Sequence, residues 1–369
     1  MPRDLPSTYF NSFRRKLLAW YDQNHRDLPW RQTNDPYKIW VSEIMLQQTQ
    51  VATVIDYYHR FLKRFPTVQS LAQADIEAVL QLWSGLGYYR RARSLHRAAV
   101  QIIDEFSGKF PETVQQIQSL HGVGRYTAGA VASFAYDSYA PILEANTIRL
   151  HARLLGIQEP VKSTESTKPL MEFAESILPL KSGSGHVLNQ AVMELGSQIC
   201  TPQNPICMKC PVKSHCKVHE KGLENSIPVI TAKPKPIPMT HVGVIIFDKK
   251  NRILLRKNRA GQWWEGLWDL PWVEVDHFKS NKQDDQAYRN LEQQLVSVYN
   301  LDCRITQLHR VVRHTVTKYK IEYHCLRGTL SRTFKLPKSE AMDWFTLAEL
   351  PPVSSRFNKI ELEKPLTKT

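Results

Sequence analysis

The segment LHGVGRYTAGAV, residues 120–131, contains a turn that indicates the fold of the first part of the chain. Gly122 and Gly124 flank Val123 in a Gly-x-Gly turn, and the small residues that follow favour the start of a helix. In such a turn the backbone N–H groups at the N-terminus of the second helix can approach a phosphate group. The segment therefore predicts a helix-hairpin-helix motif, and an ordinary tight turn is the alternative.

Around this turn, from about residue 8 to residue 220, apolar residues recur at helical spacing between short polar breaks. This pattern predicts a mainly α-helical domain over residues 1–225. Asp35 before Pro36 predicts one helix start, because the aspartate can cap the helix and the proline fits its first turn. Glu43 lies in that helix, close to an apolar stripe formed by Trp40, Val41, Ile44 and Met45.

Four of the six cysteines fall within 17 residues, with the spacing Cys-x6-Cys-x2-Cys-x5-Cys: Cys200, Cys207, Cys210 and Cys216. In a cytosolic chain such a group indicates metal ligation rather than disulfides. A structural zinc site usually presents two close cysteine pairs, whereas a 4Fe-4S cluster held by four thiolates accommodates this spacing. We therefore expect a 4Fe-4S cluster, with zinc or four unligated cysteines as the alternatives.

The helical pattern ends in ENSIPVITAKPKPIPMT, residues 224–240, where prolines exclude helix and favour an extended linker. We place this linker at residues 226–238. Beyond it, HVGVIIFD and RILLRK are short β-rich runs with a turn between them, so residues 239–369 predict a second, α/β domain.

The formal net charge is +14, shared by both parts of the chain, and such an excess makes nucleic acid the first partner to consider. No apolar run approaches the roughly 18 residues of a membrane helix, and MPRDLPSTYF lacks the features of a secretory signal. We therefore expect a cytoplasmic protein, associated with the nucleoid in a bacterium, and no membrane partner.

A second glycine turn occurs in WSGLGYYRRAR, residues 83–93, where two tyrosines precede Arg90, Arg91 and Arg93. Aromatic side chains beside arginines suit a wedge into stacked bases that is surrounded by phosphate contacts. Tyr88 is the predicted wedge, and a core tyrosine is the alternative.

Together with RDLPWR (26–31), SEIMLQQTQV (42–51), MELGSQIC (193–200) and the cysteine group, these motifs resemble the MutY family of adenine DNA glycosylases. The resemblance is close over residues 8–220 and loose beyond them. It implies that adenine mispaired with 8-oxoguanine or guanine in double-stranded DNA is flipped out and excised by a monomer. Endonuclease III, a relative with the same core, carries a catalytic lysine where this chain has Tyr126, so we expect a monofunctional enzyme rather than a lyase.

The resemblance also implies two catalytic carboxylates, one to protonate the departing adenine and one to stabilise the cationic sugar. Glu43 matches the acid. The second is an aspartate in a Val-Asp-Gly-Asn segment of the family, where this chain has Leu143, Glu144, Ala145 and Asn146. The longer arm of Glu144 can misplace the charge, but Ala145 restricts the backbone, so that the loop can sit differently and recover the geometry. Asp137 lies too far upstream to substitute without a rearrangement, and Glu144 is therefore the expected counterpart of the aspartate.

The remaining site residues are also carried over from the family, and each has packing as its alternative role. Gln48 and Tyr88 match residues that enter the double helix near the lesion. The hairpin residues Gly122, Val123 and Gly124 match DNA-backbone contacts. The expected adenine pocket contains Arg26, Leu28, Trp30 and Gln190, whose amide can pair with a base edge.

The second domain, with GLWDLPWVE at 266–274, resembles a Nudix fold. The helix RNLEQQL carries only Glu292 where a catalytic Nudix helix needs several glutamates for magnesium, so we expect no nucleotide hydrolysis. In the family this domain reads 8-oxoguanine through a Phe-Ser-His loop, and Thr317 retains the hydroxyl in the matching Val-Thr-Lys. The altered loop and Glu144 leave a non-catalytic mismatch-binding protein as one alternative. An endonuclease III-like lyase is the second alternative, and Tyr126 argues against it.

Overall fold

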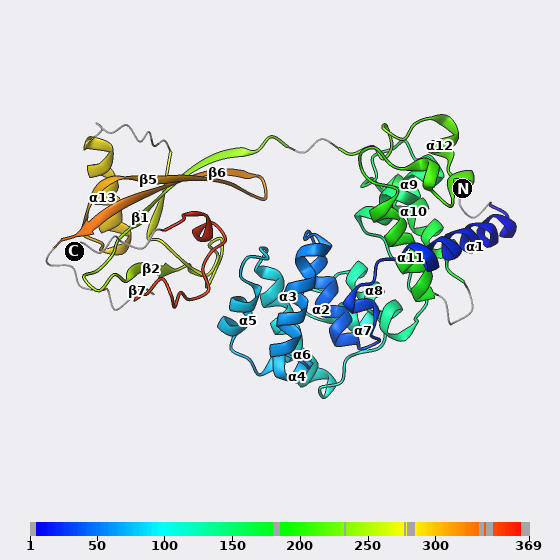
Figure 1. Ribbon diagram of the computed structural model, residues 1–369, viewed down its shortest axis with the longest axis horizontal. Coiled ribbons are helices and arrows are strands. Elements are labelled where there is room, and N and C mark those ends of the chain that lie inside the picture. Colours follow the sequence, from blue (N-terminus) through cyan, green and yellow to red (C-terminus); the bar gives the residue numbers. More distant parts are fainter. Residues whose placement is uncertain are drawn as a thin grey trace. The chain divides into compact units, whose positions relative to one another are not determined.

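The computed structural model describes residues 5–179, 185–231, 234–276, 278, 285–331, 336 and 342–362 (Figure 1). Two compact units divide the chain: residues 1–76 with 90–232, and residues 77–89 with 233–369. No helix in these described ranges has both the length and the apolar character needed to cross a membrane. Residues 232 and 233 of the expected linker, and 363–369 at the end of the expected second domain, lie outside the described residues.

Helices follow one another over the first part of the chain, which confirms the predicted mainly α-helical domain. The expected start of α2 is present, because the Asp35 carboxylate accepts a hydrogen bond of 3.0 Å from the backbone N–H of Tyr37. The helices are α1 (Ser7–Asn24), α2 (Pro36–Leu46), α3 (Val51–Arg64), α4 (Val68–Ala72), α5 (Ile76–Trp83), α6 (Arg90–Phe106), α7 (Val114–Ser119), α8 (Arg125–Tyr136), α9 (Ala145–Leu155), α10 (Thr164–Ile177), α11 (Gly185–Gln198) and α12 (Lys217–Lys221), with 3-10 turns η2 (Pro29–Arg31), η3 (Cys207–Lys209) and η4 (Lys213–His215).

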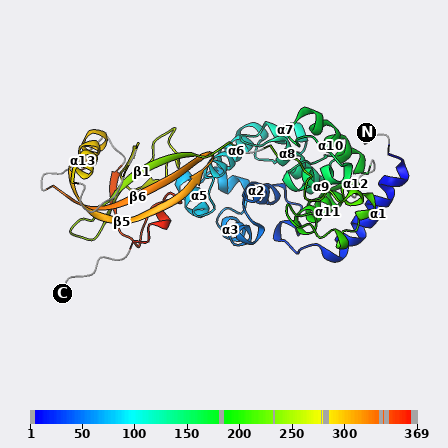
Figure 2. The ribbon, with the colours of Figure 1, turned by 90° about the horizontal axis from the view of Figure 1, so that it is seen from above.

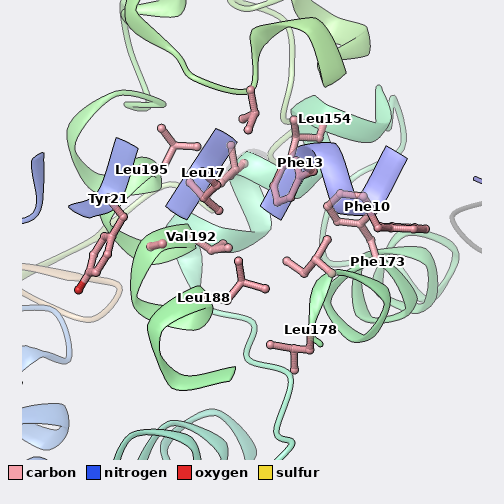
Figure 3. Close-up of a cluster of buried hydrophobic side chains, with 14 of the residues drawn as sticks. Phe10, Phe13, Leu17, Tyr21, Leu154, Phe173, Leu178, Leu188, Val192 and Leu195 are labelled. Carbon is pink, nitrogen blue, oxygen red and sulfur yellow. The ribbon is translucent and has the colours of Figure 1, made fainter. Parts of the chain in front are cut away.

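A buried apolar cluster joins the N-terminal helix to helices from the far end of this unit (Figure 3). Phe13 and Leu17 of α1 pack with Phe173 of α10 and Leu195 of α11, and all four are fully buried. Burial of one such side chain contributes about 1.5–3 kcal/mol, so this contact fastens α1 firmly to α10 and α11. Cys200 belongs to the same cluster, so the start of the segment that carries the four closely spaced cysteines, residues 200–216, is anchored in this core.

The predicted hairpin joins α7 to α8, and its two glycines serve different purposes. Gly122 has a φ of +75°, and a Cβ atom there would lie 2.5 Å from the Cβ of Ser94, so both backbone conformation and packing require glycine. Gly124 is the N-cap of α8, and a Cβ atom there would meet no atom within 4 Å. The backbone at the start of α8 is therefore open to a ligand.

The second unit contains a four-stranded sheet of order β4-β1-β6-β5 and a three-stranded sheet of order β3-β2-β7, which confirms the α/β expectation. Figure 2 shows β1, β5 and β6 lying side by side. The elements are β1 (Ile237–Ile245), β2 (Ile253–Lys257), β3 (Trp268–Asp269), β4 (Trp272–Val275), α13 (Asp285–Tyr299), β5 (Cys303–Val316), β6 (Tyr319–Leu330), β7 (Met342–Phe345) and the 3-10 turn η5 (Phe357–Lys359).

The end of the expected linker differs from the prediction, because Ile237 and Pro238 belong to β1. β1 pairs with β6 from Ile237 onward, whereas its pairing with β4 begins only at Thr240. Pro238 therefore lies where the strand has one neighbour, and its missing N–H group breaks no ladder on the β4 side.

Candidate functional site

A cavity of about 550 Å³ opens in the helical unit, between η2, α2, α8, the start of α9 and α11. Leu28 and Trp30 are buried and also line the cavity, so packing and pocket formation coincide for both. The structure brings together here most of the site residues predicted from the sequence: Arg26, Leu28, Trp30, Glu43, Gln48, Gly124, Tyr126, Glu144, Asn146 and Gln190.

Glu43 lies on α2 with only 4% of its surface exposed. Its carboxyl group accepts a hydrogen bond of 2.8 Å from the Tyr126 hydroxyl on α8. Burial raises the pKa of Glu43 to about 7, with a further rise from the nearby charge of Glu144, while the Tyr126 hydrogen bond and the charge of Arg31 oppose the increase. The side chain can therefore hold a proton near neutral pH and donate it into the cavity.

Glu144 is the N-cap of α9, a role not expected from the sequence. Its carboxylate accepts hydrogen bonds from the backbone N–H groups of Asn146 at 2.8 Å and Thr147 at 2.9 Å, and from the Asn146 amide at 3.1 Å. Burial raises the pKa of Glu144, and these donors act in the opposite direction. Its added methylene is thus accommodated by folding the carboxylate back over the helix end.

The neighbours of Glu144 complete this arrangement. Ala145 is the first helical residue of α9, so the backbone there needs no glycine. A Cβ atom on Gly196 would lie 2.9 Å from the Cβ of Asn146, so glycine allows α11 to approach α9 at that residue. Asp137 forms an ion pair of 2.9 Å with His186 and is absent from the cavity lining, as the sequence argument expected.

A third carboxylate in the cavity, Glu194 on α11, was missed from the sequence. Its oxygens accept hydrogen bonds from the backbone N–H, Nε and Nη2 of Arg26 at 3.0, 2.8 and 2.9 Å, from Nη2 of Arg31 at 2.7 Å, and from the Gln198 amide. Burial alone raises its pKa, but the hydrogen bonds from Arg26 and Arg31 lower it to about 2. The signal in the sequence was the pair of arginines at the two ends of RDLPWR, which require an anionic partner when buried.

Gln190 lies one turn before Glu194, and its carbonyl oxygen accepts a hydrogen bond of 2.7 Å from the Tyr21 hydroxyl. Its amide N–H groups are therefore the part left to face a ligand in the cavity.

Gln48 follows α2 with a φ of +58°, a conformation that a non-glycine residue seldom adopts.

The arginines after the second glycine turn do not share one role. Arg91 donates hydrogen bonds to the carbonyls of Ile44 at 2.8 Å and Met45 at 2.9 Å, which caps the C-terminus of α2. This corrects the expectation that it contacts phosphate. Tyr88 is 54% exposed, with a φ of +49°, so the alternative of a core tyrosine is wrong for Tyr88 and applies to Tyr89, which is buried.

The four cysteines of the metal-ligand motif line one small cavity together with Arg153. Arg153 donates to the sulfur of Cys200 at 3.3 Å, and the backbone N–H of His219 donates to that of Cys216 at 3.5 Å, so both sulfurs act as hydrogen-bond acceptors. Tetrahedral zinc at about 2.3 Å from each sulfur needs sulfurs about 3.8 Å apart. Among the described residues, the three possible ligand atoms that lie within 4.8 Å of one another belong to Cys207, His219 and Glu224, and no three of the four cysteines form such a group.

In the second unit, Thr317 lies at the tip of the β5–β6 hairpin with a φ of +50°. Its hydroxyl donates to the carbonyl of Val316 at 2.8 Å, so the oxygen lone pairs face solvent. Lys318 places its ammonium group 5.3 Å from the centre of the Tyr319 ring.

On α13, the Glu292 carboxylate accepts a hydrogen bond of 2.7 Å from the backbone N–H of Ile305, so this side chain has a structural role that links α13 to β5.

Two family models match the chain, each over part of one predicted domain. One is described as an HhH-GPD superfamily base excision DNA repair protein and matches residues 41–176. The other is a NUDIX domain and matches residues 242–355. A solved structure of a thermostable thymine-DNA glycosylase is 29% identical with a TM-score of 0.54, covering 58% of this chain and 98% of that one.

Curated relatives agree with these matches. An adenine DNA glycosylase of Rattus norvegicus is 46% identical over 233 residues, which are 60% of this chain and 45% of the rat protein. An adenine DNA glycosylase of Buchnera aphidicola subsp. Baizongia pistaciae is 38% identical over 284 residues, 73% of this chain and 79% of the relative. The chain spans less than half of the length of the mammalian relatives that it matches.

Proposed function

The chain belongs to the adenine DNA glycosylase family, and we propose that it excises adenine mispaired with 8-oxoguanine or guanine from double-stranded DNA. The observation that carries this proposal is the buried carboxyl group of Glu43, whose pKa of about 7 suits a general acid at neutral pH. A stacked adenine cannot reach a group at 4% exposure, so the base is flipped out of the duplex into the cavity.

In this mechanism Glu43 transfers its proton to a ring nitrogen of adenine while the N-glycosidic bond breaks. The Tyr126 hydroxyl, 2.8 Å from Glu43, holds the carboxyl group in place and stabilises the carboxylate that remains. The sugar develops positive charge, which the carboxylate of Glu144 stabilises, and Asn146 fixes that carboxylate at 3.1 Å. Water then completes the hydrolysis.

The flipped base is held by the wall that Leu28 and Trp30 form and by the Gln190 amide. Because Tyr21 occupies the Gln190 carbonyl, the amide N–H groups pair with an acceptor nitrogen of adenine. Gly122, Val123 and Gly124 bind the DNA backbone at the start of α8. Arg26 forms part of the cavity wall around the flipped adenine. Gln48 and the exposed ring of Tyr88 enter the duplex near the lesion.

One experiment separates this function from its two rivals: single-turnover incubation of the protein with a duplex that carries adenine opposite 8-oxoguanine, analysed with and without alkali. We expect strand breaks only after alkali, because Tyr126 cannot form a Schiff base with the sugar. Breaks without alkali would indicate a lyase. Binding without any breaks would indicate a mismatch-binding protein.

We propose that Cys200, Cys207, Cys210 and Cys216 hold a 4Fe-4S cluster with a structural role. The cluster ties together four points of a segment that carries Lys209, Lys213 and Lys217, and these cations then contact DNA phosphates. We place the protein, as a monomer, in the cytoplasm or on the bacterial nucleoid, where its DNA substrate lies.

Anaerobically purified protein is expected to be brown, with about four irons per chain. Cys210→Ser should lose iron and weaken both folding stability and DNA affinity, measured by iron analysis, thermal melting and filter binding. Cys303→Ser is the matched control, since Cys303 is a buried cysteine of the second unit and should leave the iron content unchanged. A colourless protein with one zinc per chain would contradict the assignment.

We further propose that the tip of the β5–β6 hairpin reads the lesion strand. The Thr317 lone pairs can accept a hydrogen bond from the N7–H group that 8-oxoguanine has and guanine lacks. Thr317→Val is therefore expected to narrow the preference for the 8-oxoguanine mispair by about 1 kcal/mol, roughly fivefold in relative affinity. An unchanged preference would show that the hairpin tip does not read the lesion.

Lys318→Ala provides the contrasting variant at the neighbouring position. An ammonium group favours phosphate over a specific base atom, so its loss should weaken both complexes alike. We expect the slope of log affinity against log salt to flatten by about one unit, as for one lost phosphate contact. A change in the ratio of the two affinities would instead assign lesion recognition to Lys318.

A further inference from the structure

Glu194 joins the two ends of residues 26–31, the segment that forms one wall of the cavity. Arg26 and Arg31 both donate to its carboxylate, and Arg31 also donates through Nη1 to the carbonyl of Arg26 at 3.1 Å. Leu28 and Trp30 lie between these anchored ends. The carboxylate therefore holds the backbone that presents both apolar side chains to the cavity.

Glu194 also sets the charge balance around Glu43. The titratable groups that face the cavity come from every element around it: Arg26, Arg31, Glu43, Tyr126, Glu144 and Glu194. The positive charge of Arg31 lowers the pKa of Glu43. The carboxylate of Glu194, 2.7 Å from Nη2 of Arg31 and fully buried, offsets that charge.

We propose that Glu194 is a positioning residue for adenine excision: it fixes Arg26 and Arg31 in the wall of the cavity and neutralises them, so that Glu43 keeps the proton that the departing base requires. This inference rests on the proposed function. Glu194 acts through the two arginines, which donate hydrogen bonds to its carboxylate.

The test is the pH dependence of the single-turnover rate of adenine release. Excision needs protonated Glu43, so the rate falls as pH rises through the pKa of that group. Glu194→Gln leaves the arginine charges without their counter-ion, and the midpoint of this fall should move down by about one pH unit. Glu194→Asp keeps the charge and should keep a midpoint close to that of the parent.

A second variant changes the same balance in the opposite direction. Arg31→Gln removes the positive charge near Glu43, so the midpoint should move up. The double variant, Glu194→Gln with Arg31→Gln, should return towards the parent midpoint. A purely structural role for Glu194 predicts lower rates in both variants, without a downward midpoint in one and an upward midpoint in the other. The direction in which each midpoint moves is therefore the decisive measurement.

Glu159→Gln is the matched control, because Glu159 is exposed and absent from the cavity lining. It should reproduce the parent profile. If Glu194→Gln folds and keeps the parent midpoint, the inference is wrong. If Glu194→Gln does not fold, Arg31→Gln provides the test: a pH midpoint that moves down or stays unchanged in that variant also overturns the inference. A parent protein that releases no adenine at any pH would instead refute the proposed function, and the inference would fall with it.

Discussion

Glu43→Gln is expected to slow adenine release by about a thousandfold or more, while affinity for the mispaired duplex stays within roughly tenfold. The amide cannot donate a proton to a leaving base, yet it keeps the size of the side chain and can still accept the Tyr126 hydrogen bond. The proton is needed only once the glycosidic bond stretches, so little ground-state affinity depends on it. Single-turnover kinetics and equilibrium binding measure the two quantities separately.

The same residue predicts the pH dependence of the parent. Because the pKa of Glu43 is raised to about 7, its acid form dominates below that pH and is lost above it. The rate of adenine release should therefore be highest below pH 7 and fall as pH rises through this value. In Glu43→Gln any residual rate should no longer follow this titration.

Glu159→Gln is the control for removing one carboxylate from this unit, since Glu159 is exposed and outside the cavity. It should retain the rate and pH profile of the parent. Parental rates in Glu43→Gln would remove this residue from the mechanism and leave the cavity without a general acid.

Glu144→Gln is expected to lower the rate of adenine release by about a hundredfold or more, because the cationic sugar loses its anionic neighbour. Glu144→Asp should equal or exceed the parent, since it restores the side chain found in the family pattern. Aspartate is also a preferred N-cap, so this variant keeps the helix end satisfied. Single-turnover rates of the three proteins provide the comparison.

The N-cap position of Glu144 makes a stability measurement necessary beside the kinetics. Loss of capping typically costs about 1 kcal/mol, and the amide oxygen that Glu144→Gln introduces can still accept one of the cap hydrogen bonds. Melting temperatures should therefore change little while activity falls steeply. If both variants kept parental rates, another group would have to stabilise the sugar.

Some parts of the site follow from local sequence patterns, because the chemistry that they need is carried by neighbours in the chain. The Gly-x-Gly turn predicts the hairpin, and Gly122 indeed adopts a positive φ. Asp35 before Pro36 predicts the start of α2 and thereby the helix that carries Glu43. The cysteine spacing predicts a metal-ligand group, and its members line one cavity.

Other parts arise only from contacts between residues far apart in the chain. Glu194 lies 168 residues from Arg26, and no local periodicity reveals that the two are paired. The sequence groups Arg91 with two other arginines that were expected to contact DNA. In the structure it instead caps the end of α2 by a hydrogen bond to Met45, which is 46 residues away in the sequence. Glu144 matches a catalytic position in sequence, and only the start of α9 shows that it is also a helix cap.

The sequence by itself therefore determined the fold class and the family, and it singled out Glu43 as the proposed acid, since these depend on residue type, spacing and helical periodicity. The tertiary structure decided how that acid is tuned. The pKa of Glu43 depends on burial beneath packed helices and on the charges of Arg31 and Glu144, and burial and charge proximity exist only once distant segments have come together.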